Sequence, residues 1–299
     1  MSIERIAIAG ASGLIGTALA SRLENRFEVV RLVRRPASTT TERRWDPTAG
    51  YVEGLGLSDI DAVVNLSGAG IADRRWTASR RHELLASRLN STRTLARLMA
   101  TEDRPSVLLS GSAVGFYGNT GDREIDESAP EGEGFLADVC QRWEAATAEA
   151  VRAGVRTALL RTGLVLDRRG GFLGKQLSLF RAGLGGRLGD GSQWLPWITL
   201  ADHVAACEHL LINDVSGPVN LTAPFPVTNA ELTDELGRQL HRPTKLPVPL
   251  PALRLAFGDQ LVEEALLTSN RIRPAALHAN GFAFRHPKLP EALAAVLAV

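Results

Sequence analysis

The sequence contains few cysteines. Its 299 residues include only Cys140 and Cys207, which is too few for a disulfide framework. A chain of this length buries about 75% of its extended surface, so it needs neither disulfide nor metal to hold a core. The apolar run near the N-terminus is interrupted by Glu4 and Arg5, which is unlike a signal peptide. We therefore expect a protein of the reducing cytoplasm.

Long apolar runs and an excess of one charge are also absent. No run reaches the roughly 18 apolar residues of a membrane span, and 34 basic residues balance 33 acidic ones. Balanced charge gives no electrostatic footprint for nucleic acid or a membrane surface. The six histidines show no metal-ligand spacing with cysteines or acids. We expect a small-molecule substrate, and no nucleic acid, membrane or metal as partner.

Lysine and tyrosine are rare. Among the 34 basic residues only Lys175, Lys245 and Lys288 are lysines, and the two tyrosines are Tyr51 and Tyr117. The first half of the chain therefore has no lysine at all. This limits any acid–base chemistry that needs a tyrosine beside a lysine.

The start of the chain contains an apolar run followed by regularly spaced glycines. Residues 6–9 predict a buried strand, and residues 14–23 show helical spacing. A strand, a glycine turn and a helix in this order form a pyrophosphate seat, where the helix N-terminus offers free N–H groups to the anion. The alternative is an ordinary strand-to-helix turn. The predicted cofactor contacts here are Gly10, Ser12, Gly13, Leu14, Ile15 and Gly16.

The next strand, predicted at residues 27–33, ends in two arginines. In a dinucleotide-binding fold, the end of this strand meets the adenine ribose, and an acidic residue there would bind the 2′-hydroxyl of NAD. Arg34 and Arg35 stand there instead. Their guanidinium groups suit the 2′-phosphate of NADP, although both could be solvated surface arginines. We predict NADP(H) as the cofactor.

Two further strands end in small and polar residues. The strand at residues 61–66 leads into Ser67, Gly68 and Ala69, which would line the path of the nucleotide, together with Asn65 and Leu66. The strand that begins near residue 106 carries Ser110, Ser112 and Tyr117 to its carboxyl end, where ligands bind in open α/β sheets. Backbone capping for the serines and packing for the tyrosine are the alternatives.

The second half alternates helices with glycine-rich segments. Helices are predicted at 135–153, 201–211 and 228–240, and strands at 155–161 and 219–221. Residues 183–191 are dense in glycine and form either a lid or an ordinary loop. We predict an α/β fold, a doubly wound parallel Rossmann sheet at 1–165 completed by the strand near 219–221. Residues 166–299 would form a smaller C-terminal substrate region.

Taken together, these segments resemble an atypical extended short-chain dehydrogenase/reductase of the NAD(P)-dependent epimerase/dehydratase superfamily. More narrowly, the chain is similar to the "epimerase family" branch, which has its own C-terminal domain of unknown function. The matching segments cover nearly the whole chain. They are Gly10–Gly16, Asn65–Gly70, Trp76 with Ser87, Arg88 and Thr92, Ser110–Gly118, Phe135–Glu144, Arg161–Leu166, Gln193–Ile198 with Asp202, and Gly281–Phe284.

The resemblance also shows where this chain departs from the superfamily. Its members use a tyrosine as acid/base and a lysine four residues later, whose charge favours the phenolate. Aligned on Glu144, this chain has Leu136 and Cys140 at these positions. A shift by one gives Phe135 and Val139, so no register restores the pair. Arg88 replaces the usual asparagine of the preceding helix and joins the expected cofactor contacts.

Two hypotheses about function follow. In the first, the protein is an NADP-dependent oxidoreductase or sugar-nucleotide epimerase of unknown substrate, with Ser112 orienting the substrate and Tyr117 donating a proton. The family positions of Arg161, Arg187, Gln193 and Trp197 imply substrate contacts. In the second, the protein binds NADP(H) without turnover, as a sensor or partner-binding protein. Helix-mediated dimers are common in the superfamily, so a homodimer is one expectation.

Overall fold

The computed structural model describes residues 3–102, 104–244 and 246–298. Its centre is an eight-stranded sheet in the spatial order β12-β8-β6-β5-β1-β2-β3-β4, parallel except for the last pair. The strands are β1 (Arg5–Ala9), β2 (Glu28–Val33), β3 (Glu42–Asp46), β4 (Tyr51–Val52), β5 (Ala62–Asn65), β6 (Val107–Ala113), β8 (Arg156–Thr162) and β12 (Gly217–Leu221). Chain order reverses at β1, so the sheet has the Rossmann switch point between β1 and β5.

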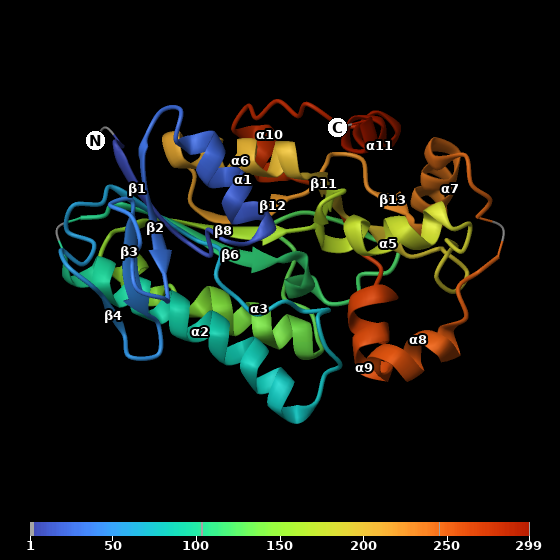
Figure 1. Cartoon of the computed structure of the whole chain (residues 1–299), viewed down its shortest axis with the longest axis horizontal. Helices are drawn as coiled ribbons and strands as arrows, with labels where there is room; N and C mark the ends of the chain where they lie inside the picture. The colour runs from blue at the N-terminus through green and yellow to red at the C-terminus, as the bar shows by residue number, and fades with distance from the viewer. Residues whose placement is uncertain (1–2, 103, 245, 299) are drawn as a thin grey trace.

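Helices cover both faces of this sheet (Figure 1). One face carries α1 (Leu14–Leu23) and α6 (Leu200–Ile212), and the other carries α2 (Ala78–Thr101), α3 (Phe135–Ala145) and α4 (Ala148–Arg152). The side chains of β1 alternate between the two layers. Ile6 and Ile8 belong to the core cluster under α1 and α6, whereas Ala7 and Ala9 join Leu95 in the cluster under α2. The predicted doubly wound α/β fold is therefore confirmed.

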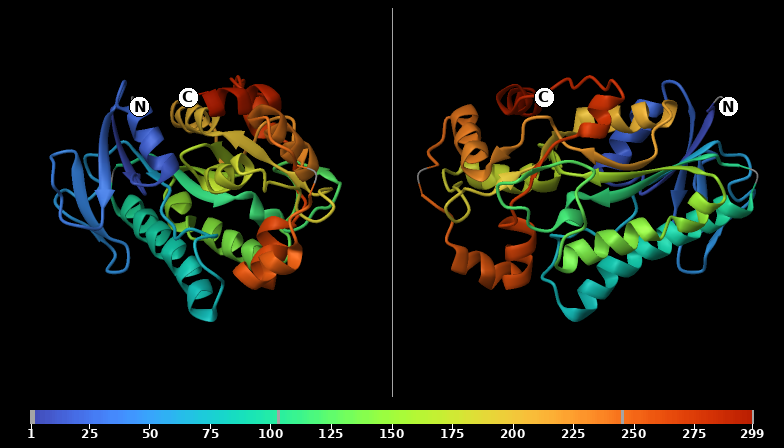
Figure 2. Two further views of the ribbon diagram at one scale, coloured as in Figure 1. Left: turned by 45° about the vertical axis from the view of Figure 1, so that its right-hand side comes forward. Right: turned by 180° about the vertical axis from the view of Figure 1, so that it is seen from behind.

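The rest of the second half forms a smaller assembly beside the carboxyl ends of the strands, best seen from behind in Figure 2. Its own core packs β9 (Leu164–Asp167), α5 (Gly171–Arg181), β11 (Trp197–Thr199), α7 (Asn229–Leu240) and α11 (Leu289–Ala298). The remaining elements are 3₁₀ turn η1 (Val114–Tyr117), β7 (Glu124–Ile125), β10 (Trp194–Leu195), β13 (Val227–Thr228), α8 (Leu250–Phe257), α9 (Asp259–Leu261), π turn η2 (Val262–Leu266), β14 (Arg271–Ile272) and α10 (Ala275–Ala279). The division at residue 165 stays a prediction.

Candidate functional site

The turn between β1 and α1 leaves no room for a side chain at Gly10 or Gly16. Gly10 has φ +82°, and a Cβ there would lie 2.8 Å from the carbonyl carbon of Leu66. A Cβ on Gly16 would lie 2.2 Å from the carbonyl oxygen of Gly10. Gly13 is the N-cap of α1, and no side chain caps the helix. The backbone N–H groups of the first turn are therefore available to a ligand, as a pyrophosphate requires.

The other predicted contacts of this turn lie around the same helix end. Ser12 and Gly13 are exposed, and Leu14 and Ile15 are half-buried. The side chain of Leu14 lies within 3.7 Å of the Cβ positions of Gly170 and Gly171, at the start of α5. The smaller assembly thus reaches the helix N-terminus, and a nucleotide seated there would lie beside α5.

The structure separates the two arginines after β2. Arg35 forms a two-pronged ion pair with Glu42 and also donates to Ser38 Oγ at 3.2 Å. This guanidinium, with Ser38, lowers the pKa of Glu42 to about 2. Arg34 is exposed and has no hydrogen-bonding partner among the described residues. Of the predicted pair, Arg34 is therefore the one whose guanidinium is available for a phosphate.

The loop after β5 is fixed by side chains from α2. Buried Asn65 donates to Thr92 Oγ1 at 2.9 Å and accepts from the backbone N–H of Ser67 at 3.1 Å. The N–H of Ala69 donates to Ser87 Oγ at 3.1 Å. Leu66 and Gly68 belong to the same loop, and Leu66 closes against Gly10. The predicted contacts 65–69 and the glycine turn therefore border one another.

Arg88 lies beneath this loop and is buried. Its Nη1 donates to the backbone oxygen of Leu84 at 2.9 Å, and its guanidinium lies 5.0 Å from the ring centre of Trp143. A Cβ on Gly68 would lie 3.2 Å from Cζ of Arg88. The predicted cofactor contact is thus placed against the loop that follows β5.

At the end of β6, Ser112 is part of a buried polar network. Its hydroxyl donates to Glu144 Oε1 at 2.6 Å, and Glu144 forms a two-pronged pair with Arg161, with both bonds at 2.9 Å. Ser110, one pleat earlier, is fully buried. Because the proton of Ser112 is directed to Glu144, its oxygen can act toward a ligand as a hydrogen-bond acceptor. Sequence reasoning used Glu144 only as an alignment mark and missed this role.

Tyr117 completes the network from η1. Its hydroxyl donates to Asn220 Oδ1 at 2.8 Å and accepts from Arg161 Nη1 at 2.9 Å. Burial raises the pKa of Tyr117, so its hydroxyl stays protonated. In this arrangement the proton of Tyr117 is directed to Asn220, and its donation to a substrate stays a prediction. Asn220, on β12, was missed because 103 residues separate it from Tyr117.

Cys140, which one of the two registers places at the position of the family's lysine, lies close to Gly115, whose Cβ would be 3.7 Å from the cysteine sulfur. Burial raises the pKa of the Cys140 thiol to about 12. A thiol of that pKa stays protonated and uncharged at neutral pH, so it supplies neither the charge of a lysine nor a ready base.

The structure gives the four expected substrate contacts different surroundings. Arg161 belongs to the network around Ser112, but Trp197 is fully buried and donates through Nε1 to the backbone of Phe225 at 3.0 Å. Gln193 donates to two backbone oxygens at 3.3 Å, and Arg187 is exposed. Trp197 is therefore a core residue, since its ring has no surface to offer a substrate.

The glycine-rich segment 183–191 is held to the smaller assembly. The N–H of buried Leu188 donates to Asn229 Oδ1 at 2.7 Å, and Leu188 bridges to Val248. A Cβ on Gly186 would lie 1.9 Å from the backbone oxygen of Leu246. These contacts at the centre of the segment hold it as an ordered loop.

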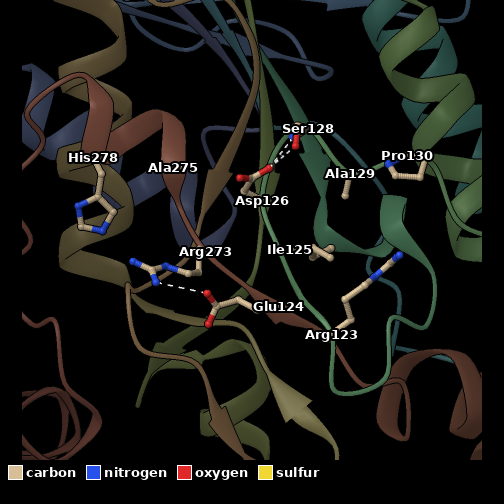
Figure 3. Close-up of a pocket in the computed structure, with 10 residues that line it drawn as sticks. All are labelled: Arg123, Glu124, Ile125, Asp126, Ser128, Ala129, Pro130, Arg273, Ala275 and His278. Atoms are coloured by element: carbon tan, nitrogen blue, oxygen red, sulfur yellow. Dashed lines mark hydrogen bonds and ion pairs between the residues drawn. The ribbon is translucent and has the colours of Figure 1, made fainter.

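A cavity of about 740 Å³ lies elsewhere, near the edge strand β12 (Figure 3). Among its lining residues, Arg273 donates to Glu124 at 3.3 Å, and Asp126 accepts two hydrogen bonds from Ser128. The lining residues are Arg123, Glu124, Ile125, Asp126, Ser128, Ala129, Pro130, Arg273, Ala275 and His278. None of the predicted site residues lines it.

The described ranges contain neither a membrane-spanning helix nor a cluster of metal ligands. No helix in the part of the chain that the structure describes is long and apolar enough to cross a membrane. Within the same residues, no three or more His, Cys, Asp and Glu side chains are grouped as a metal site would require.

The sheet order and the open glycine turn define a protein of the Rossmann dinucleotide-binding class. Residues 6–221 match the NAD dependent epimerase/dehydratase family, and residues 248–296 match DUF1731, a domain of unknown function. The chain belongs to the NAD dependent epimerase/dehydratase family. The expected resemblance is thereby confirmed.

Individual relatives match along nearly the whole chain. The epimerase family protein Mb2239 of Mycobacterium bovis is 46% identical over 290 residues, which is 96% of each chain. The human epimerase family protein SDR39U1 is 36% identical over 304 residues, covering 98% of this chain and 100% of that one.

Two solved structures share the architecture. The crystal structure of human SDR39U1 (isoform 2) with NADPH superposes with a TM-score of 0.91 at 34% identity, over 98% of this chain and 99% of that chain. The nucleoside-diphosphate sugar epimerase of Corynebacterium glutamicum gives a TM-score of 0.80 at 35% identity, over 99% of this chain and 58% of that chain.

Proposed function

We propose that this protein binds NADP(H) across the carboxyl ends of β1, β5 and β6 and carries out hydride-transfer chemistry on a hydroxyl-bearing small molecule. The observation that carries the proposal is the uncapped N-terminus of α1 above Gly10 and Gly16, whose Cβ positions are filled by backbone. The similarity to human SDR39U1, a structure solved with NADPH, supports the choice of cofactor.

The cofactor contacts would come from three elements. The α1 turn holds the pyrophosphate through backbone N–H groups, and Arg34 reaches the 2′-phosphate. The loop after β5 lines the path to the nicotinamide. The residues in these roles are Gly10, Ser12, Gly13, Leu14, Ile15, Gly16, Arg34, Asn65, Leu66, Ser67, Gly68 and Ala69. Arg35, Arg88 and Ser110 stay predicted contacts beside them.

Ser112 would be the residue that touches the substrate. A bound nicotinamide supplies a hydride acceptor or donor, and the substrate must be oriented beside it. Since Ser112 donates to Glu144, its oxygen is an acceptor, so we assign to it a substrate hydroxyl that donates. Arg161 and Glu144 hold Ser112 in place, and Tyr117 holds Arg161. Tyr117 thus becomes a positioning residue in this proposal.

Nucleotide sugars are the first substrates to test, because the Corynebacterium glutamicum neighbour is described as a nucleoside-diphosphate sugar epimerase. They carry several secondary hydroxyls that could donate to Ser112. Gln193 and Arg187, whose family positions imply substrate contacts, are proposed for the substrate's other contacts.

The experiment mixes the protein with NADP⁺ and a panel of nucleotide sugars. Reduced nicotinamide absorbance reports net oxidation, and separation of the sugar products reports epimerisation, which returns the hydride and leaves no net absorbance change. Where a substrate is found, S112A should lower turnover about a hundredfold and leave the Kd for NADPH unchanged. S58A, which removes an exposed hydroxyl, is the matched control and should change neither. Unchanged turnover in S112A would remove Ser112 from the site. Tight NADPH binding with no turnover across the panel would favour the non-catalytic hypothesis.

A further inference from the structure

Arg88 is a buried cation that no carboxylate neutralises among the described residues. The residue is only 8% exposed. The one hydrogen bond that its guanidinium makes in the described ranges goes to the backbone oxygen of Leu84 at 2.9 Å. Burying an unpaired charge is costly, so a folded protein that keeps one usually has a use for it.

The other two arginines that are buried in the described ranges, Arg80 and Arg161, are each paired with a glutamate. Arg161 is bound by both oxygens of Glu144, and Arg80, eight residues before Arg88 on α2, donates to Glu83 at 2.7 Å. Burial lowers the pKa of Arg88 to about 10, which still leaves it charged at neutral pH. Arg88 is therefore a net source of positive potential inside the fold.

The surroundings of Arg88 place it between the ends of β5 and β6. On the β5 side, a Cβ on Gly68 would lie 3.2 Å from its Cζ. On the β6 side, its guanidinium lies 5.0 Å from the ring centre of Trp143, and that ring fills the space where a Cβ of Gly111 would stand, at 2.7 Å. The guanidinium of Arg88 therefore lies near the carboxyl ends of β5 and β6, on the side of β1 opposite to β2.

The fold determines which end of a bound dinucleotide would lie near Arg88. The pyrophosphate sits at the N-terminus of α1, and the adenine ribose lies toward the end of β2, where Arg34 stands. The nicotinamide half must then extend to the other side of β1, over β5 and β6. Arg88 therefore lies at the nicotinamide end of the site.

We propose that Arg88 makes this site discriminate between the redox states of its cofactor, holding NADPH more tightly than NADP⁺. This inference rests on the proposed function. The oxidised ring carries a positive charge and the reduced ring carries none, so an unneutralised guanidinium nearby disfavours the oxidised form alone. At a separation of several ångströms within protein, repulsion between the guanidinium and the oxidised ring weakens NADP⁺ binding on the order of tenfold relative to NADPH binding.

The test is calorimetric titration of the purified full chain with NADPH and, separately, with NADP⁺ at one ionic strength. Both nucleotides carry the same phosphates, so any loss of a phosphate contact cancels in the ratio of their Kd values. We expect Kd for NADP⁺ to exceed Kd for NADPH about tenfold in the wild type. In R88M the ratio should fall close to one, and in R88K it should persist. R93M removes an exposed arginine from the same helix and should keep the wild-type ratio.

Several outcomes overturn the inference. Equal affinities in the wild type, or a ratio that survives in R88M, would contradict it while leaving nucleotide binding intact. If R88M does not fold, R88Q takes its place, and an unchanged ratio in R88Q has the same meaning. Failure of the wild type to bind either nucleotide would instead refute the proposed function, and the inference with it.

Discussion

At the scale of single residues, the charges around the predicted cofactor site differ in how they are paired. Arg35 is bound by Glu42, whereas Arg34 is exposed without a hydrogen-bonding partner in the described ranges. Arg161 is neutralised by Glu144, whereas Arg88 is not neutralised there. The sequence shows four arginines at suitable positions, but pairing decides which of them can act on a ligand, and pairing depends on the folded chain.

The account assigns the 2′-phosphate chiefly to Arg34. A charge-assisted hydrogen bond to phosphate contributes about 1.5–3 kcal/mol, so R34A should weaken NADPH binding roughly tenfold or more. Binding of NADH, which lacks the 2′-phosphate, should not change. R35A should have a smaller effect, because Arg35 is already bound by Glu42.

Titration of each variant with both nucleotides measures this. R152A is the matched control, since it removes an exposed arginine from α4. If R34A bound NADPH as well as the wild type while R35A did not, the roles of the two residues would be exchanged.

At the scale of elements, local signals were sufficient for the strand–turn–helix unit at the start of the chain. Gly10 and Gly16 are each required by a close backbone approach, Gly16 by Gly10 itself and Gly10 by Leu66 at the end of the next sheet strand. The start predicted for the helix at 228–240 was likewise local, since the structure forms a capping box between Thr228 and Glu231 at the start of α7. Such signals are local, so the sequence alone carries them.

Other elements were set by contacts that the sequence does not show. The helix expected at 135–153 is divided into α3 and α4, where Thr147 Oγ1 donates to the backbone oxygen of Glu144 at 2.7 Å. The strands β3 and β4 at one end of the sheet were not predicted, because β3 consists mostly of charged residues without the apolar pattern of a buried strand, and β4 has only two residues. Ser112 and Glu144 lie 32 residues apart, so their bond was equally invisible.

The packing of α6 on the sheet predicts a pH dependence of stability. His203 on α6 is fully buried against Thr162 of β8, and burial lowers its pKa from 6.5 to about 4. The unfolded chain therefore takes up a proton near pH 6.5, and the folded chain takes it up only near pH 4. The free energy of unfolding should fall as the pH is lowered from 6.5 to 4, by about 3 kcal/mol from this residue.

Urea unfolding at several pH values measures this slope. H203Q removes the titrating group and should flatten the curve between these pH values. H82Q, which replaces an exposed histidine, should keep the wild-type slope. An identical slope in H203Q and the wild type would contradict the assignment.

At the scale of the whole molecule, two assemblies meet at the carboxyl ends of the strands. Lys175 of α5 pairs with Asp73 at 3.0 Å, and Arg81 of α2 donates to Gln260 of α9 at 2.7 Å. β12 comes from the second half of the chain and yet pairs with β8 in the main sheet. Family membership and the α/β class were predictable because the motifs are spread along the chain. The Ser112 network was not, because it joins strands from both halves.

The central claim is that the glycine turn seats NADP(H). Titration of the wild-type protein with NADPH and NADH, with G16A alongside, tests it most directly. The account predicts that NADPH binds at least about tenfold more tightly than NADH. It also predicts that G16A loses both nucleotides, because its Cβ would lie 2.2 Å from the Gly10 oxygen at the pyrophosphate seat. A folded wild-type protein that binds neither nucleotide, or a folded G16A that binds both unchanged, would contradict the account.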